Sequence, residues 1–95
     1  MEEEKVEIRL EAVGSAPKLK VTKFSLKKSY HFGRLIDFVK KSLAKAGQLK
    51  ESDSLFLYVN SSFSPPPHER IADIYDNFKA GSFLVVNYAV GEAWG

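Results

Sequence analysis

The run Phe83-Leu84-Val85-Val86-Asn87-Tyr88-Ala89-Val90 decides the fold that we expect for this chain. It is strongly apolar and rich in β-branched and aromatic residues, which predicts a buried strand. The five residues that follow, Gly91-Glu92-Ala93-Trp94-Gly95, have neither the length nor the pattern of a further element. We therefore expect a core strand that leads directly into a short exposed tail, residues 91–95.

The last residue of that tail, Gly95, indicates a possible chemical use. Glycine has no side chain, so its backbone can enter a narrow space that excludes any other residue. A glycine carboxylate on an exposed tail can be threaded into an enzyme, activated there and joined to another molecule. Taken alone, a terminal glycine is better explained by chance, given the ordinary frequency of glycine. The rest of the chain has to decide between these explanations.

Outward from that strand, the beginning of the chain predicts a hairpin. Residues 6–12 alternate strictly between apolar and charged side chains, which is typical of a strand with one face in the core. Residues 13–17 include glycine, serine and proline and predict a turn. A second alternating run extends from Leu19 to Leu26, so the two runs are expected to pair as an antiparallel hairpin.

The second run of this hairpin contains a break in its alternation. Leu19 and Val21 share one face of a regular strand. Phe24 and Leu26 fall on the other face unless one residue is bulged out between the two pairs. A bulge would place Phe24 in the core, which its residue type favours. A regular strand would instead expose Phe24 beside Lys23 as a contact for a partner.

Two helices are expected after the hairpin. Ser29 is the expected N-cap of the first helix, and Gly47 ends it. A shorter helix is expected over residues 68–78, where large apolar side chains share one face. The apolar stripe of the first helix consists of Phe32, Leu35, Ile36, Val39 and Leu43.

A third strand is expected between the two helices. The run Leu55-Phe56-Leu57-Tyr58-Val59 has apolar residues on both faces. Residues 60–67 contain three prolines and predict a loop, because proline is excluded from a central strand or a helix interior. Phe63 lies inside this loop.

The predicted order is strand, strand, helix, strand, short helix, strand. By the right-handed crossover rule, the strand after the first helix can return parallel to a hairpin strand. The expected fold class is α+β: a ubiquitin-like β-grasp with a mixed four-stranded sheet, one main helix and a short second helix. A ferredoxin-like arrangement is the nearest competitor. A chain of 95 residues is expected to form a single domain over residues 1–95.

The sequence offers no candidate for catalysis or metal binding. It contains no cysteine, and its two histidines, His31 and His68, lack the spacing of metal ligands. It has no nucleophile elbow and no glycine-rich phosphate loop. We therefore expect no catalytic residue, no metal and no bound cofactor. The acidic N-terminus is unlike a signal peptide, and no apolar run reaches membrane-spanning length.

Lysines cluster along the second predicted strand and the first predicted helix. Interleaved with Phe24, they resemble a platform for nucleic acid. Lysines on an exposed sheet edge also discourage aggregation, and the net charge is only +2. A solvated surface is therefore favoured, and no nucleic-acid partner is expected. The lysines concerned are Lys18, Lys20, Lys23, Lys27, Lys28, Lys40, Lys41 and Lys45.

Several blocks of the sequence resemble the ubiquitin-like autophagy modifiers of the autophagy-related protein twelve family. The similarity covers nearly the whole chain in the right order, and the tyrosine-valine-asparagine block and the Trp-Gly ending are the most specific parts. The chain departs from the family in its short N-terminal segment, its long connection around residues 47–53, and Phe24 where some members carry tryptophan. The matching blocks are Leu55 to Pro65 with Pro67, Leu84 to Tyr88, Ala93-Trp94-Gly95, Ala12 to Gly14 with Pro17, and Leu35 to Lys41.

The resemblance implies a non-catalytic modifier that acts in autophagy. Gly95 would be adenylated by an ATP-using activating enzyme (autophagy-related protein seven), passed as a thioester to a conjugating enzyme (protein ten), and joined by an isopeptide bond to a lysine of protein five. Since the chain stops at Gly95, no protease is expected to be needed. The conjugate would bind another conjugating enzyme, protein three, and promote lipidation of the protein-eight modifier. The expected location is cytoplasmic, with recruitment to the preautophagosomal membrane through partners.

The resemblance also implies roles for individual residues. Trp94 would matter for recognition of the tail, and Tyr58 and Phe63 would support the interface with protein five. The positions that match those used to hold protein three are Lys5, Lys23 and Phe24. This match favours an exposed Phe24. The alternative function is a non-covalent ubiquitin-like interaction domain that binds the same partner without conjugation.

Overall fold

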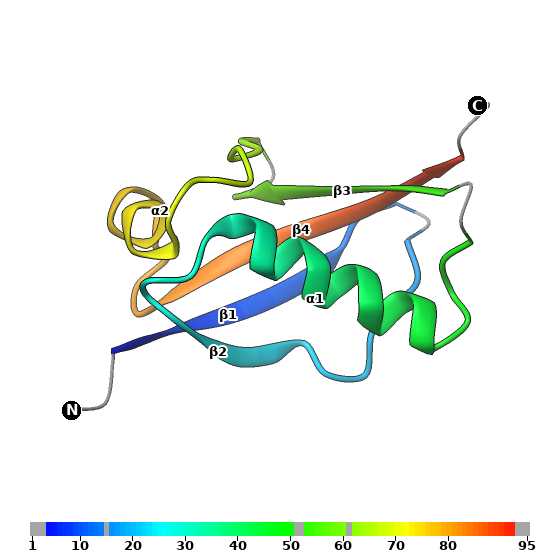
Figure 1. The fold of residues 1–95 in the computed structure, drawn as a ribbon, viewed down its shortest axis with the longest axis horizontal. Helices are drawn as coiled ribbons and strands as arrows, with labels where there is room; N and C mark the ends of the chain where they lie inside the picture. The colour runs from blue at the N-terminus through cyan, green and yellow to red at the C-terminus, as the bar shows by residue number, and fades with distance from the viewer. Residues whose placement is uncertain (1–3, 15, 51–52, 61, 93–95) are drawn as a thin grey trace.

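A computed structural model gives the fold of the chain and describes residues 4–14, 16–50, 53–60 and 62–92. The described part contains strands and helices in the predicted order (Figure 1). The strands are β1 (Lys5–Ala12), β2 (Lys23–Lys27), β3 (Asp53–Val59) and β4 (Phe83–Glu92), and the helices are α1 (Phe32–Lys45) and α2 (Ile71–Phe78).

The strands form one mixed sheet in the order β2-β1-β4-β3. β1 is antiparallel to β2 and parallel to β4, and β3 is antiparallel to β4. α1 crosses one face of this sheet, and the short α2 lies at the end where β4 begins (Figure 1). The arrangement confirms the expected β-grasp with one main helix and one short helix, and it differs from the ferredoxin-like alternative.

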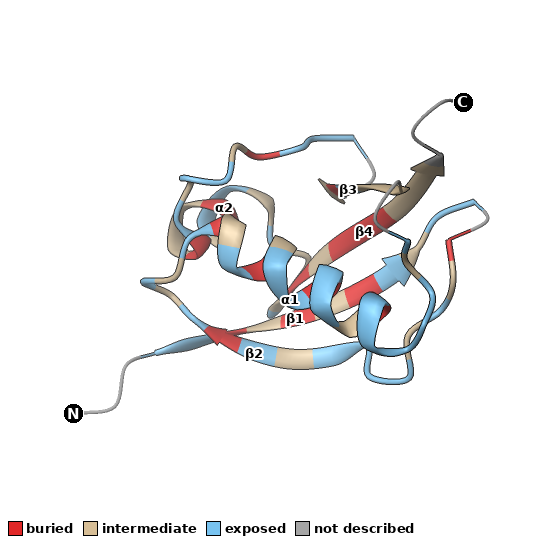
Figure 2. Ribbon diagram, turned by 45° about the vertical axis from the view of Figure 1, so that its right-hand side comes forward, coloured by how far each residue is buried: buried red, intermediate tan, exposed pale blue. Residues whose placement is uncertain are grey.

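The core lies between α1 and the sheet (Figure 2). β4 supplies its centre, because every second side chain of this strand, from Leu84 through Val86 to Tyr88, is buried. The predicted buried strand is thus confirmed. α1 meets it with the predicted stripe, of which Phe32, Leu35, Val39 and Leu43 are fully buried and Ile36 is partly buried.

The N-terminus of α1 is capped differently from the expectation. Its N-cap residue is His31 rather than Ser29, and the His31 side chain makes no capping bond. The N–H groups of the first two helical residues donate instead to carbonyls within residues 67–69, at 2.7 and 2.9 Å. Backbone N–H groups that have no acceptor within the first turn of a helix are therefore satisfied here by the loop at residues 67–69. That loop is not helical, and α2 begins at Ile71 rather than at residue 68.

The break in alternation before Phe24 has a simple structural cause. Residues 17–22 are irregular, and β2 begins only at Lys23. Tyr88 holds this irregular segment to the sheet: its hydroxyl donates to the Pro17 carbonyl at 2.6 Å and accepts a hydrogen bond from the Leu19 N–H at 3.0 Å. The expected strand is therefore wrong in its first half, and no bulge is needed.

Tyr88→Phe is expected to loosen residues 17–22 without unfolding the domain. The change removes both hydrogen bonds and should lower the free energy of unfolding by about 1–3 kcal/mol. Amide hydrogen exchange at Leu19 should lose the protection that the Tyr88 hydroxyl gives it, whereas Val86 in the core should become faster only by the loss of global stability. Tyr75→Phe, on α2, is the matched control. Unchanged protection of the Leu19 amide in Tyr88→Phe would contradict this role.

Candidate functional site

β4 continues two residues further than the sequence predicts. Gly91 pairs with Ser54, and Glu92 pairs with Asp53. The expected exposed tail, residues 91–95, is therefore wrong at its first two positions. The physical reason is that β3 begins two residues earlier than expected, at Asp53, and offers these residues a pairing partner.

The end of β4 is closely packed against one aromatic ring. A Cβ atom added at Gly91 would lie 3.2 Å from Cε2 of Phe56, so a residue with a side chain would require a small shift of that ring. The pairing of β1 with β4 ends at Tyr88, and the last four residues of β4 pair with β3 alone. Trp94 and Gly95 lie outside the described residues, so their roles stay predictions.

The sheet face away from α1 carries an exposed aromatic side chain on β3. Phe56 is 46% exposed, whereas Leu57 and Val59 are buried in the core. Because side chains alternate along a strand, Tyr58 lies on the same face as Phe56, where it is half-buried. Sequence reasoning did not single out Phe56. The signal in the sequence was that residues 55–59 have apolar side chains on both faces of the strand, whereas α1 can cover only one face.

Phe63 lies just beyond the end of β3 and is 40% exposed. Its ring stacks on that of Phe78 in α2, with the ring centroids 5.0 Å apart. The Val59 N–H donates to the carbonyl of Phe63 at 2.6 Å, which holds the loop against β3. Phe63 and Tyr58 therefore lie at the same end of β3. Phe63 is supported by α2 and still exposes part of its ring to solvent.

Phe24 is half-buried rather than exposed, which corrects the placement implied by the resemblance. It pairs opposite Ile8, and Leu26 pairs opposite Val6. These three neighbours are buried, so Phe24 faces the core side of the sheet. Its ring contacts Phe38 of α1, with the centroids 4.5 Å apart. Part of the ring is packed, and part remains accessible.

Lys5 and Lys23 are both exposed, but they do not converge with Phe24 on one face. Lys5 pairs with Lys27, and Lys23 pairs with Arg9, so the two lysines lie at opposite ends of the β1–β2 ladder. Lys23 is adjacent to Phe24, so their side chains point to opposite faces of the strand. Lys23 and Phe24 lie on the edge strand β2, whereas Lys5 lies on the neighbouring strand β1.

An ion pair lies next to Lys5 at this edge. Nζ of Lys28 donates a hydrogen bond to Oε2 of Glu4 at 2.7 Å. The bond lowers the pKa of Glu4 and raises the pKa of Lys28. Because the pair is open to solvent, it contributes little to stability. It ties the start of β1 to the end of β2.

The described residues contain no group of three or more His, Cys, Asp or Glu side chains that could hold a metal ion. His31 and His68 are both exposed. In the part of the chain that the structure describes, no helix has the length and apolar character needed to cross a membrane.

Comparisons with known proteins agree with this geometry. The chain is 43% identical over 94 residues to the ubiquitin-like protein ATG12 of Oryza sativa subsp. indica, covering 99% of this chain and 94% of that protein. It is 45% identical to the protein of the same name from Medicago truncatula, covering 96% and 88%. The corresponding mouse protein is 38% identical over 96% of this chain, which spans 62% of the mouse protein.

A solved structure and a family model extend the comparison. The crystal structure of Trypanosoma brucei ATG8 superposes with a TM-score of 0.78 and 26% identity, covering 96% of this chain and 77% of that one. The sequence model of the family described as ubiquitin-like autophagy protein Apg12 matches residues 5–95. The chain therefore belongs to the Apg12 family of ubiquitin-like autophagy proteins.

Proposed function

We propose that this chain is a protein modifier, itself not an enzyme, that is joined through Gly95 to a lysine of autophagy-related protein five. Besides family membership, the position of β4 supports this proposal. The strand extends four residues beyond its pairing with β1 and ends at Glu92. Gly91 and Glu92 belong to the sheet through their pairing with β3, so an activating enzyme that acts on Gly95 would lie close to the folded domain.

The proposed chemistry passes one acyl group along a series of carriers. The carboxylate of Gly95 attacks the α-phosphate of ATP on protein seven, and pyrophosphate leaves. A cysteine thiolate of that enzyme then displaces AMP and forms a thioester. The acyl group moves to a cysteine of protein ten by thioester exchange. A lysine amine of protein five displaces that thiol and forms the isopeptide bond. ATP is used by the enzyme, and the chain itself needs no cofactor.

Thioester formation tests the first part of this proposal. Mixing the chain with ATP and protein seven should produce a covalent species that survives denaturation and disappears when a thiol reductant is added. Non-reducing electrophoresis measures it. The positive control is a modifier from the organism that supplies protein seven, which this enzyme activates. If that modifier forms a thioester under these conditions and the present chain does not, activation at Gly95 is refuted.

The proposed contact surface for protein five lies around the end of β3. Phe56 and Tyr58 present an apolar patch on the open face of the sheet, and Phe63 lies beyond the end of the strand. Aromatic side chains are the usual energetic centres of protein interfaces. Phe63 is already supported by Phe78, so it loses little conformational freedom on binding. This surface adds Phe56 to the residues implied by the resemblance.

The proposed contact for protein three is the outer edge of β2. An extended peptide that pairs with an edge strand sends alternate side chains to opposite faces of the sheet. Such a peptide would meet Lys23 on one face and the accessible part of Phe24 on the other, and Lys5 lies on the same face as Lys23 but one strand further in, on β1. The conjugate with protein five would in this way promote lipidation of protein eight. The modifier would act in the cytoplasm and reach the preautophagosomal membrane only through its partners.

Phe24→Ala is expected to weaken binding to protein three by about tenfold or more, since buried aromatic contacts dominate interfaces. The change should also lower the free energy of unfolding by about 1–2 kcal/mol, less than the ~3–5 kcal/mol of a fully buried phenylalanine. Calorimetry and chemical denaturation measure the two effects. Val13→Ala, an exposed apolar residue beyond β1, is the control. Undiminished binding would contradict the role of Phe24.

A further inference from the structure

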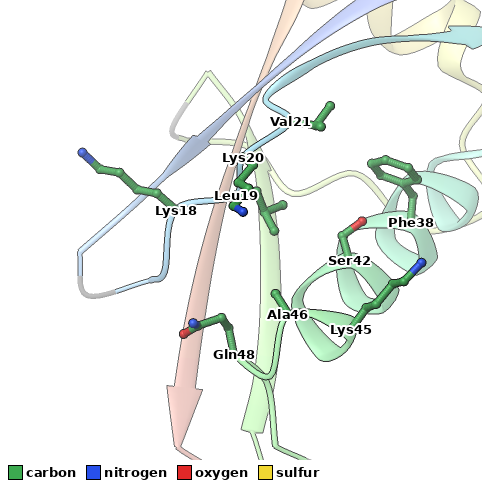
Figure 3. Close-up of a pocket in the computed structure, with 9 residues that line it drawn as sticks. All are labelled: Lys18, Leu19, Lys20, Val21, Phe38, Ser42, Lys45, Ala46 and Gln48. Carbon is green, nitrogen blue, oxygen red and sulfur yellow. The ribbon is translucent and has the colours of Figure 1, made fainter.

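The two edges of the sheet are covered differently. Near β2, an open groove lies between the segment that precedes this strand and α1, with Val21 and Phe38 on its two sides (Figure 3). β3 forms the other edge of the sheet, and the loop that follows it folds back along its outer side, where Val59 and Phe63 form an antiparallel bridge. The loop also contains Ser64, whose side chain takes no part in the contacts described above.

Ser64 holds the loop to β3 at a point where the backbone cannot. The Val59 N–H donates to the Phe63 carbonyl at 2.6 Å, and the Phe63 N–H donates to the Val59 carbonyl at 3.2 Å. If this antiparallel pairing continued, residue 65 would lie opposite Leu57 and donate to its carbonyl. Residue 65 is proline, which has no N–H. Oγ of Ser64 donates to the Leu57 carbonyl instead, at 2.9 Å.

The same proline gives Ser64 the sequence context that proline-directed protein kinases select. Ser64-Pro65 is the only pair in the sequence in which serine or threonine precedes proline. Proline keeps the residue before it in an extended conformation, which is the conformation that the cleft of a kinase binds. Ser64 is exposed, and the net contribution of a single hydrogen bond is small. The hydroxyl therefore becomes accessible once its bond to the Leu57 carbonyl opens.

A phosphate on Ser64 would remove the attachment of this loop to β3. The hydroxyl proton is lost when the phosphate ester forms, so Oγ has no hydrogen left to donate. The phosphate is mainly a dianion at neutral pH, and its oxygens then only accept hydrogen bonds, as the Leu57 carbonyl does. The two acceptors repel each other, so the phosphorylated side chain would have to leave the edge of β3.

Release of Ser64 would also disturb the aromatic side chain that precedes it. The ring of Phe63 is 40% exposed and stacks on Phe78. The backbone of Phe63 is held by its bridge with Val59, which lies next to the hydrogen bond of Ser64. A dianion beside this ring would in addition have to be desolvated in an apolar interface. A phosphate would thus weaken a contact surface that includes Phe63 in two ways.

We propose that Ser64 is phosphorylated by a proline-directed kinase and that the phosphate releases the loop from β3, which weakens binding at the surface around Phe63. In this reaction Oγ attacks the γ-phosphorus of ATP, the bond from that phosphorus to the β–γ bridging oxygen breaks, ADP leaves, and the hydroxyl proton passes to a base of the kinase. The modification and the release of the loop do not depend on conjugation through Gly95. The effect on binding rests on the proposed contact surface for protein five.

Treatment of the 95-residue chain with ATP, Mg²⁺ and a purified mitogen-activated protein kinase tests the modification site. Mass spectrometry should show one added phosphate, and fragmentation should place it on Ser64 rather than on Ser62, which phenylalanine follows. The folded chain should react within about tenfold of the rate of a synthetic peptide of residues 59–70, because only a weak attachment has to open. A peptide that reacts while the folded chain does not, or modification that persists in Ser64→Ala, would overturn the proposal.

Amide hydrogen exchange of the phosphorylated chain tests the release of the loop. Exchange at Val59, whose N–H donates to Phe63, should become faster by roughly three- to tenfold relative to exchange at Val86 in the core. Ser64→Ala removes the hydroxyl without adding a charge, and it should produce a smaller increase at Val59. Unchanged protection of Val59 in the phosphorylated chain would overturn the proposed release.

Binding to protein five, measured by calorimetry, separates this proposal from the proposed contact surface. Phosphorylation should weaken binding by about tenfold or more, as Phe63→Ala should, whereas Ser64→Ala should change it by less than about threefold. If Phe63→Ala weakens binding and the phosphate does not, the proposed effect of phosphorylation is wrong. If neither change weakens binding, Phe63 is not a contact for protein five, and it is the proposed contact surface that fails.

Discussion

Deletion of Gly95 is expected to abolish the conjugate with protein five and to leave the stability of the domain unchanged. Without Gly95 the terminal carboxylate belongs to Trp94, whose large side chain is much harder to fit into a narrow active site than the hydrogen atom of glycine. The tail is also shortened from three residues beyond Glu92 to two, which removes about 3 Å of reach. The buried core of the described residues ends at Tyr88, so the fold is expected to persist without Gly95. Gel electrophoresis and thermal denaturation measure the two outcomes.

Two controls make this result specific. The deletion variant should still bind protein five non-covalently, since the proposed contacts at Phe56, Tyr58 and Phe63 are intact. Gly95→Ala adds one methyl group without shortening the tail, and it should reduce conjugation less than the deletion does. A conjugate that forms at the normal rate without Gly95 would show that the covalent bond, if any, lies elsewhere.

Leu35→Ala is expected to have the largest effect on stability. Leu35 is fully buried in the stripe of α1 that meets the sheet. Truncation of a buried leucine costs about 2–5 kcal/mol, because apolar contacts are lost and a cavity remains. The expected total stability of a domain of this size is ~5–10 kcal/mol, so the variant should lose a large part of it.

Chemical denaturation checks this second prediction. The midpoint should fall substantially in Leu35→Ala, with little change in the dependence on denaturant. Lys41→Ala is the matched control, because Lys41 is exposed on the same helix. A loss below about 1 kcal/mol for Leu35→Ala would mean that the α1–sheet core is packed less tightly than the structure indicates.

The elements that could be predicted from the sequence are those whose secondary structure is set by their own local pattern and not by contacts with distant residues. The alternation of residues 6–12 and the apolar run from Phe83 are properties of the strands themselves, and the stripe of α1 is a property of the helix. Their order then leaves few topologies. The β-grasp followed from these local patterns, and the structure confirms it.

The errors occurred where distant residues decide the local structure. Residues 17–22 look like a strand, but Tyr88, about 70 residues away, holds them in an irregular path through two hydrogen bonds. Ser29 looks like a helix cap, but carbonyls of residues 67–69 accept the hydrogen bonds instead. Gly91 looks like the start of a tail, but it pairs with Ser54. Each of these contacts is invisible in a local pattern.

The candidate site was only partly predictable for a related reason. Sequence and resemblance placed Lys5, Lys23 and Phe24 together, but strand alternation sends Lys23 and Phe24 to opposite faces. Phe24 is half-buried because Phe38 lies 4.5 Å away on α1, a contact that depends on how the helix crosses the sheet. The exposure of Phe56 likewise follows from which face α1 covers.

Intact-mass spectrometry of a complete reaction tests the central claim most directly. The chain is mixed with ATP, protein seven, protein ten and protein five. The account predicts a new species at the summed mass of the chain and protein five less one water, stable to thiol reductant, with fragments that join Gly95 to a lysine side chain. If the two proteins co-elute but this species never forms, the chain is a non-covalent partner, and the claim that it is a modifier is contradicted.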